Sequence, residues 1–254
     1  MEREDKAILI EQNFTAMMGA TEALLDVNSP VNSLVISGAP GIGKTFRLTE
    51  RLDRAHNSLE WTVNMISGKM TTLALFEALY QNRHATSILV LDDMDSVFES
   101  EDALNILKGA LDTGKRTISY LTSSKYLEEA GVPQQFTMHG KVIFITNKNL
   151  SALAKGTSKM APHYAAFMSR SVYVDLKIHN NNDIMIHIEN VMRKKNILTK
   201  FNVSNEGSEQ ILNWMLKNED RLRAPSLRMP VLMAGMYNKF PYEWETMCNT
   251  MFLE

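Results

Sequence analysis

The chain has 254 residues, of which 44% are hydrophobic and 22% charged, and its formal net charge is −2. This composition is ordinary for a globular protein that buries a core, and it excludes binding of nucleic acid or membrane through a strongly basic overall charge. Cys248 is the single cysteine, which excludes an internal disulfide. The amino terminus is charged, and the sequence has no apolar signal segment and no membrane-spanning run. We therefore expect a cytoplasmic protein without a membrane partner.

The first part of the chain alternates between helix and strand. Apolar residues at helical spacing predict a helix over residues 5–27, which Asn28-Ser29-Pro30 ends. The alternation that follows is typical of a parallel sheet covered by helices. We expect strands at 33–37, 60–66 and 87–91, and helices at 46–55, 72–80 and 101–111.

Two β-prone stretches, 116–122 and 134–139, interrupt this alternation, and we interpret them as a hairpin-like insertion at about residues 115–140. A strand at 142–145, a helix at 161–168 and a strand at 172–176 complete the alternating part. From Lys177 onward the pattern predicts only helices, at 183–195, 206–217, 229–237 and 244–252. This change predicts an α/β core over residues 1–177 and a small all-helical domain over residues 178–254.

The glycine-rich stretch Gly38-Ala39-Pro40-Gly41-Ile42-Gly43-Lys44-Thr45 fits a phosphate-binding loop at every fixed position. It follows a predicted strand and precedes a predicted helix, which is the context that such a loop requires. Glycines let backbone N–H groups turn toward a polyphosphate, a lysine reaches the outer phosphates, and a threonine hydroxyl can ligate Mg²⁺. A glycine turn with a chance lysine is the alternative. The residues that we expect to bind nucleotide are Gly38, Pro40, Gly41, Ile42, Gly43, Lys44, Thr45 and Phe46.

Polar residues follow other predicted strands, at the edge of the sheet where ligands of such folds bind. Asp92 closes the strand at 87–91, where its carboxylate and the Thr45 hydroxyl would hold Mg²⁺. The next residue, Asp93, would orient or deprotonate the attacking water. Asn147 ends a further strand and could hydrogen-bond the same water or the terminal phosphate. A solvated turn is the structural alternative for all three residues.

Two arginines are candidates for charge stabilisation. Arg170 stands just before the strand at 172–176, where it is either a surface arginine or an arginine finger in phosphoryl transfer. Arg228 opens a helix of the carboxyl-terminal part, and Arg221 and Arg223 compete with it for any phosphate-sensing role.

The order of these parts resembles the AAA+ ATPases, a branch of the P-loop NTPases, over nearly the whole chain. Gly38 to Thr45 matches Walker A, Ile88 to Asp93 matches Walker B, and Val142 to Asn147 is similar to the sensor 1 strand. Met168-Ser169-Arg170-Ser171 is similar to the arginine-finger segment, and Ser226-Leu227-Arg228 to sensor 2. The segment from Phe136 to Asn147 and the compact length look like small AAA+ ATPases of tailed bacteriophages.

The resemblance implies a P-loop α/β core with a helical lid, and ATP and Mg²⁺ as cofactors. It also implies a homo-oligomeric ring or spiral, of which a hexamer is one form, with nucleotide at the subunit interfaces and Arg170 acting on the neighbour's nucleotide. For a phage-encoded protein the expected compartment is the host cytoplasm. The family usually has Glu after the Walker B aspartate, and Asp93 is shorter by one methylene. This departure predicts slow, switch-like hydrolysis.

The sequence says less about what the ATPase acts on. Lys69, in the turn Gly68-Lys69-Met70, falls where the family places a pore-facing loop and could contact a phosphate backbone. The insertion carries basic and aromatic residues that either line a single strand of DNA or are ordinary solvated lysines and packed aromatics. These residues are Lys115, Arg116, Tyr120, Lys125, Tyr126 and Phe136.

Three functions are compatible with these patterns. We favour an oligomeric Mg²⁺-dependent ATPase that remodels or loads something on DNA in replication or recombination, with single-stranded DNA or a replication protein as partner. A protein remodeller is the second hypothesis. A ring or filament that assembles on ATP and hydrolyses it slowly is the third, and Asp93 is the residue that supports it.

Overall fold

The computed structural model describes residues 2–254, which form two compact units. The core unit consists of Asn13–Gly38 and Lys44–Leu176. The helical unit consists of the residues up to Gln12, the loop segment Ala39–Gly43 and the carboxyl-terminal part Lys177–Glu254. The sequence-based division into domains 1–177 and 178–254 stays a prediction.

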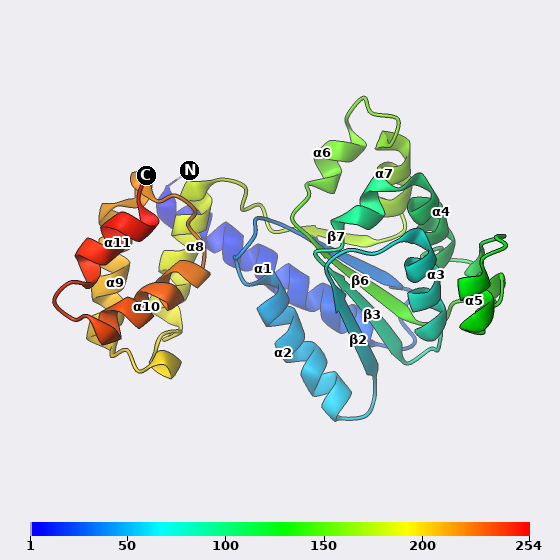
Figure 1. Ribbon diagram of the computed structural model, residues 1–254, viewed down its shortest axis with the longest axis horizontal. Helices are drawn as coiled ribbons and strands as arrows, with labels where there is room; N and C mark the ends of the chain where they lie inside the picture. The colour runs from blue at the N-terminus through cyan, green and yellow to red at the C-terminus, as the bar shows by residue number, and fades with distance from the viewer. Residues whose placement is uncertain (1) are drawn as a thin grey trace. The chain divides into compact units, whose positions relative to one another are not determined.

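The core unit is built on a five-stranded sheet with the order β2-β3-β6-β1-β7 (Figure 1). Every neighbouring pair of strands is parallel, which confirms the predicted α/β architecture. Because all strands run the same way, their carboxyl ends lie at one edge of the sheet. The strands are β1 (Ser33–Ser37), β2 (Thr62–Ser67), β3 (Ser87–Asp92), β6 (Lys141–Thr146) and β7 (Val172–Asp175).

The central strands are buried on both faces. Every residue of β1 and β6 is buried, as their continuous apolar runs predicted. The register pairs Ser37 with Thr146 and, in the next ladder, Asp92 with Ile145. The ends of β1, β3 and β6 are therefore level, and the residues that follow them are neighbours.

Two of the helices that cover the sheet begin at polar residues whose side chains cap the first turn. Thr71 accepts from the Ala74 N–H at the start of α3, and Ser100 accepts from the Ala103 N–H at the start of α4. The predicted elements exist with small shifts at their ends. The helices of this part are α1 (Arg3–Leu25), α2 (Lys44–Asn57), α3 (Thr72–Gln81), the 3₁₀ turn η1 (Asp95–Glu99), α4 (Glu101–Ala110) and α7 (Ala161–Met168).

A short helix, α6 (Leu150–Ala154), was not predicted. It has too few residues to show a helical period, and its start depends on Asn149, whose side chain accepts from the Ala152 N–H.

One face of the sheet shares a hydrophobic core with α3, α4 and α7, which pack side by side (Figure 1). Phe144 of β6 contacts Phe98 and Phe167, with ring centroids 5.9 and 5.0 Å away. These rings pack edge-on or tilted, as aromatic side chains prefer. The core thus holds the strands whose ends carry the predicted site.

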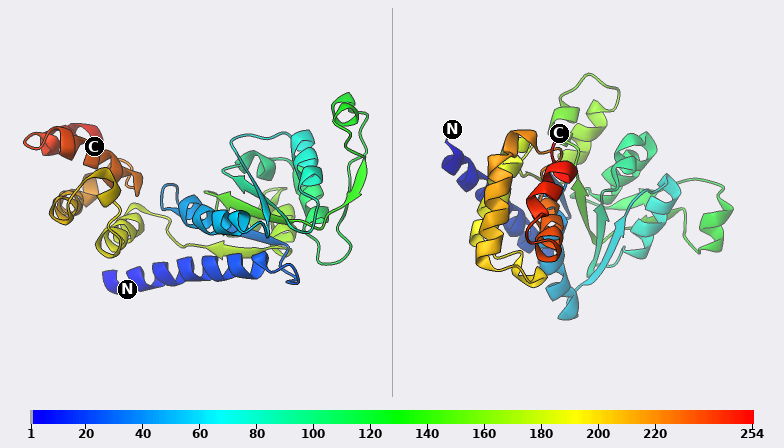
Figure 2. Two further views of the ribbon diagram at one scale, coloured as in Figure 1. Left: turned by 90° about the horizontal axis from the view of Figure 1, so that it is seen from below. Right: turned by 60° about the vertical axis from the view of Figure 1, so that its left-hand side comes forward.

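The insertion forms the expected hairpin-like element. Strands β4 (Thr117–Ser119) and β5 (Gln135–Thr137) pair antiparallel, with the short helix α5 (Lys125–Glu129) between them. The element projects from the sheet in Figure 2, and Phe136 anchors it against Phe76 at a centroid distance of 5.0 Å.

The helical unit has the four helices that the sequence predicted from residue 183 onward. Trp214 and Trp244 are buried in its core, with their ring centroids 6.5 Å apart, and half-buried Tyr237 packs on Trp244 at a centroid distance of 5.5 Å. Among residues 2–254 no helix is long and apolar enough to cross a membrane. The elements are α8 (Asn181–Lys194), η2 (Thr199–Phe201), α9 (Asn205–Lys217), η3 (Glu219–Arg221), α10 (Arg228–Lys239) and α11 (Trp244–Phe252).

Gly140, just before β6, sits where no side chain fits. A Cβ at this position would lie 2.1 Å from the Asn82 carbonyl oxygen. We expect Gly140→Ala to lower the free energy of unfolding by about 2 kcal/mol or more, because the obstacle is backbone and cannot rotate away. Chemical denaturation measures this change.

The matched control is Gly19→Ala in α1, where nothing lies within 4 Å of the added Cβ. This exposed helical site should gain roughly 0.5–1 kcal/mol. Equal stability of Gly140→Ala and the wild type would contradict the close approach.

Candidate nucleotide-binding site

The glycine-rich loop has backbone angles that favour glycine at two positions. Gly41 and Gly43 have φ of 69° and 89°, in the left-handed region. A Cβ on Gly41 would lie 2.7 Å from the Ser226 Cβ, so this position is closed to other residues for steric reasons as well. Helix α2 begins at Lys44, directly after the loop, so its first N–H groups and the positive end of its dipole belong to the same turn.

Lys44 joins the ends of two strands. Its side chain is buried, and Nζ donates to the Gly38 carbonyl and to Asn147 Oδ1, both at 2.8 Å. Gly38 follows β1 and Asn147 follows β6, which are adjacent in the sheet. The structure therefore brings together a lysine and an asparagine that are about a hundred positions apart in the sequence.

Thr45 and Asp92 form the second contact of the site. The Thr45 hydroxyl lies 3.2 and 3.1 Å from the two carboxylate oxygens of Asp92. A hydroxyl and a carboxylate are the hard oxygen ligands that Mg²⁺ prefers, and that ion usually keeps several waters. In the described part of the chain no cluster of three or more His, Cys, Asp or Glu could enclose a metal. The hydroxyl and carboxylate oxygens of Thr45 and Asp92 fit Mg²⁺ as ligands by their chemistry.

Asp93 has a strained backbone and an exposed side chain. Its φ of 55° is left-handed, which Asp tolerates better than most residues, and its N–H donates to the Ile145 carbonyl. Asp93 Oδ1 accepts from Asn147 Nδ2 at 2.6 Å. Asn147 thus bridges Lys44 and Asp93. Asp95, in contrast, accepts a hydrogen bond from Thr146 and takes no part in this chain of contacts.

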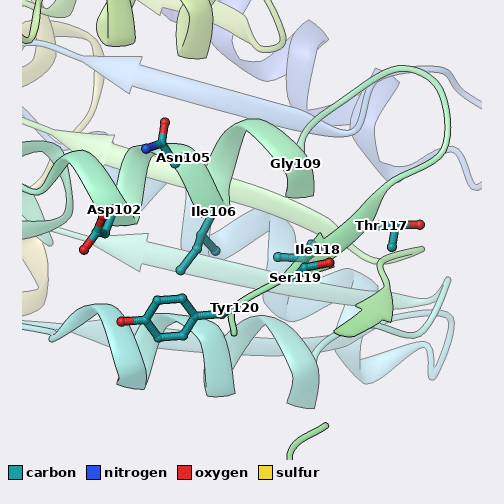
Figure 3. A pocket seen from close by; sticks show the side chains of 8 residues that line it. All are labelled: Asp102, Asn105, Ile106, Gly109, Thr117, Ile118, Ser119 and Tyr120. Atoms are coloured by element: carbon teal, nitrogen blue, oxygen red, sulfur yellow. The ribbon is translucent and has the colours of Figure 1, made fainter. Parts of the chain in front are cut away.

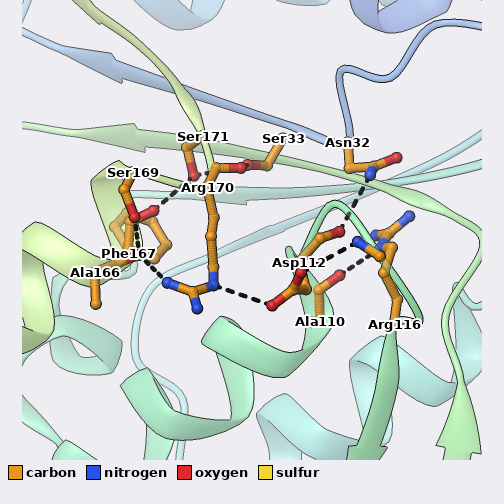
Figure 4. A network of polar contacts seen from close by, with 11 residues as sticks. Asn32, Ser33, Ala110, Asp112, Arg116, Ala166, Phe167, Ser169, Arg170 and Ser171 are labelled. Atoms are coloured by element: carbon orange, nitrogen blue, oxygen red, sulfur yellow. Dashed lines mark hydrogen bonds and ion pairs between the residues drawn. The ribbon is translucent and has the colours of Figure 1, made fainter.

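Arg170 lies near the amino ends of the parallel strands, opposite the carboxyl ends that carry Asp92, Asp93 and Asn147. It lies two residues before the amino end of β7. Its Nη1 donates to the Ala166 carbonyl at 2.7 Å and its Nε to Asp112 at 3.4 Å (Figure 4). Within one chain, the structure does not bring Arg170 to Lys44.

A hydrogen bond from the Gly114 N–H and the Arg170 guanidinium lower the pKa of Asp112. The sequence did not single out Asp112. Its position after α4 carries no motif, so only tertiary structure reveals it as the partner of Arg170.

The arginines of the helical unit differ in their contacts. Arg228 is exposed at the first residue of α10, and Arg221 is exposed at the end of η3. The guanidinium of Arg223 donates to the Leu253 carbonyl at 3.0 Å. The phosphate-sensing role stays a prediction for Arg228, with Arg221 and Arg223 as its competitors.

Two of the six insertion residues are buried and cannot line a single strand of DNA. Arg116 is buried and donates to the carbonyls of Ala110 and Gly140 at 2.6 and 2.7 Å, and burial lowers its pKa to about 10. Phe136 is also buried, so the role in binding DNA is wrong for these two residues.

The other four insertion residues are more exposed. Tyr120 packs against Phe76, and the Tyr126 hydroxyl donates to Glu77. Lys115 and Lys125 are exposed, as is Lys69 in the turn after β2.

A separate pocket of about 290 Å³ lies between α4 and β4 (Figure 3). Its lining includes Asp102 and Asn105 from the helix, Ser119 from the strand and Tyr120, which follows the strand. None of the predicted nucleotide-binding or catalytic residues contributes to it.

Comparison with known proteins gives one similar sequence and several similar folds, while no family model matches the chain. The chain is 38% identical over 243 residues to the "Uncharacterized 36.7 kDa protein in nrdC-mobD intergenic region" of Enterobacteria phage T4. This match covers 95% of the chain and 74% of the phage protein.

Two solved structures are similar in fold. AMPPCP-bound DnaA from Aquifex aeolicus matches with a TM-score of 0.52 and 16% identity, over 91% of this chain and 63% of that one. The Thermotoga maritima RuvB Holliday junction branch migration motor matches with a TM-score of 0.50 and 13% identity, over 90% and 61%. The chain thus spans less than two thirds of either structure, and identities this low establish a shared fold only.

Proposed function

We propose that the chain, which belongs to the same family as the T4 phage protein and has the fold of AAA+ P-loop ATPases, is a Mg²⁺-dependent ATPase that works on DNA as a homo-oligomer. The observation that supports hydrolysis most directly is the chain of contacts Lys44–Asn147–Asp93 beside the Thr45–Asp92 pair. Asp92, Asp93 and Asn147 stand at the carboxyl ends of β3 and β6, where ligands of doubly wound sheets bind.

Each residue has a role that its chemistry suits. Lys44 and the loop N–H groups bind the phosphates, and Thr45 and Asp92 would hold Mg²⁺, which when bound neutralises phosphate charge. Asp93 orients or deprotonates the water that attacks the terminal phosphorus, while the bond from that phosphorus to the bridging oxygen breaks and ADP leaves. Asn147 holds Asp93 and Lys44 in register through its amide.

Oligomerisation completes the site in this proposal. Arg170 is at the far edge of its own sheet, so its guanidinium can serve a triphosphate only in a neighbouring copy. A ring or spiral that presents this edge to the next subunit would supply the charge that phosphoryl transfer needs. Arg228, with Arg221 and Arg223 as alternatives, would sense the phosphates.

DNA as the partner is supported by the fold neighbours and by one exposed cation. DnaA and a Holliday junction branch migration motor share this fold, and Lys69 is exposed in the turn after β2. A specific observation also supports a nucleotide-gated assembly with slow hydrolysis. Asp93 is short, has a left-handed backbone and is engaged by Asn147, so it is less free to act on water.

Lys44→Ala tests the central site. We expect it to weaken binding of a fluorescent ATP analogue by at least 100-fold, because the buried ammonium serves both loop and phosphates. Fluorescence titration measures the affinity, and Lys159→Ala, an exposed lysine, is the control. Wild-type affinity in Lys44→Ala would refute the proposed nucleotide site.

Arg170→Ala tests the shared site. We expect it to leave ATP binding within about threefold of wild type and to reduce turnover by about 10³-fold or more. Mixing it with Lys44→Ala subunits should restore part of the turnover, because each variant supplies the group that the other lacks. Turnover is followed by phosphate release, and a mixture as inactive as its components would argue against action between subunits.

Lys69→Ala tests the DNA contact. If the turn after β2 meets a phosphate backbone, the variant should lose most of any stimulation of turnover by single-stranded DNA, with basal turnover unchanged. Lys159→Ala, an exposed lysine outside this turn and outside the insertion, is the matched control. Stimulation by a peptide or partner protein, and none by DNA, would favour the protein remodeller.

A further inference from the structure

The loop segment Ala39–Gly43 is hydrogen-bonded to carboxyl-terminal residues of its own compact unit. Leu227, just before α10, donates its N–H to the Gly41 carbonyl at 2.9 Å. Ala39, at the other end of the loop segment, donates its N–H to the Ile178 carbonyl at 3.1 Å. The loop segment Ala39–Gly43 is thus part of the same compact unit as the carboxyl-terminal helices.

One side chain takes part in this attachment. His187, on α8, lies with its Nε2 2.9 Å from the Ile42 carbonyl oxygen. A carbonyl oxygen can only accept a hydrogen bond, so Nε2 is protonated and its N–H is the donor. His187 is 1% exposed, and so is Ile42. Because water is excluded, loss of the donor would leave the carbonyl without this partner in the interior.

Peptide geometry carries the effect to the other side of the loop. The Ile42 carbonyl and the Gly43 N–H belong to one planar peptide group, and no peptide bond in residues 2–254 is cis. In a trans peptide the C=O and N–H point in opposite directions. Holding the Ile42 carbonyl toward His187 therefore turns the Gly43 N–H away from it. The Leu227 bond to Gly41 does the same for the Ile42 N–H.

We propose that His187 is a positioning residue for nucleotide binding: its bond to Ile42 presets the Gly43 N–H as a donor to the triphosphate. The inference rests on the proposed function, because backbone N–H groups of such loops bind phosphate. It adds a histidine of the helical unit to the binding machinery, and no motif predicted this role. A donor that is already aimed needs no ordering when nucleotide arrives, which favours affinity.

Two substitutions separate the hydrogen bond from packing. His187→Leu replaces the N–H donor with an apolar side chain of similar size. His187→Gln keeps an N–H donor at a similar distance from the backbone. We expect His187→Leu to weaken binding of a fluorescent ATP analogue about 5- to 30-fold. His187→Gln should recover affinity to within about threefold of wild type.

Met185→Leu is the matched control, because Met185 is also 1% exposed on α8 and the swap conserves volume. Its affinity should equal that of the wild type. Thermal unfolding without nucleotide monitors folding of all variants.

Leu227→Pro provides an independent test if His187→Leu fails to fold. The φ of Leu227 is −63°, which proline adopts, so this variant removes the N–H that holds Gly41 without forcing the backbone. We expect weaker nucleotide binding than in Leu227→Ala, which keeps the N–H.

The outcomes distinguish the two proposals. Unchanged affinity in His187→Leu, or equal losses in His187→Leu and His187→Gln, would overturn the positioning role. If Lys44→Ala also binds nucleotide like the wild type, the proposed function fails as well. Loss in Lys44→Ala alone would leave the proposed function standing without the positioning role.

Discussion

The site depends on the hydrogen bonds that the buried Lys44 ammonium donates. Lys44 is 6% exposed, and a buried charge is costly unless polar groups surround it. Its bonds to the Gly38 carbonyl and to Asn147 meet this need and tie the loop to the end of β6. Asn147 in turn holds Asp93, so one cation sets the positions of an amide and a carboxylate. The level ends of β1, β3 and β6 make this possible.

The same rule explains other buried cations of the core unit. Arg116 donates to two backbone carbonyls, and Lys141 donates to the carbonyls of Ser29 and Val31 at 2.9 and 2.8 Å. Burial lowers the pKa of both groups, and the neighbouring Arg116 adds to the effect on Lys141. Arg116 ties the insertion to the end of α4 and to Gly140, and Lys141 ties the start of β6 to the segment before β1. Arg116 is thus a structural element of the insertion, not part of a surface for nucleic acid.

The two edges of the sheet have different chemistry. The carboxyl edge carries Asp92, Asp93 and Asn147, and the amino end of β7 carries Arg170 with its partner Asp112. Parallel strands separate these groups within one chain. Phosphoryl transfer that uses both needs two copies, which is why assembly and hydrolysis are linked in the function that we propose.

The sequence alone determined the α/β class, the strand and helix order and the glycine-rich loop, because apolar runs, helical periods and glycines at fixed spacing are local signals. It also pointed to Asp92, Asp93 and Asn147, since residues after parallel strands share an edge. Tertiary structure alone decided that Phe136 and Arg116 are buried, that Asp112 holds Arg170 and that His187 holds the loop. These facts depend on contacts between residues that are distant in the chain, and a lone histidine in an amphipathic helix carries no local mark of its partner.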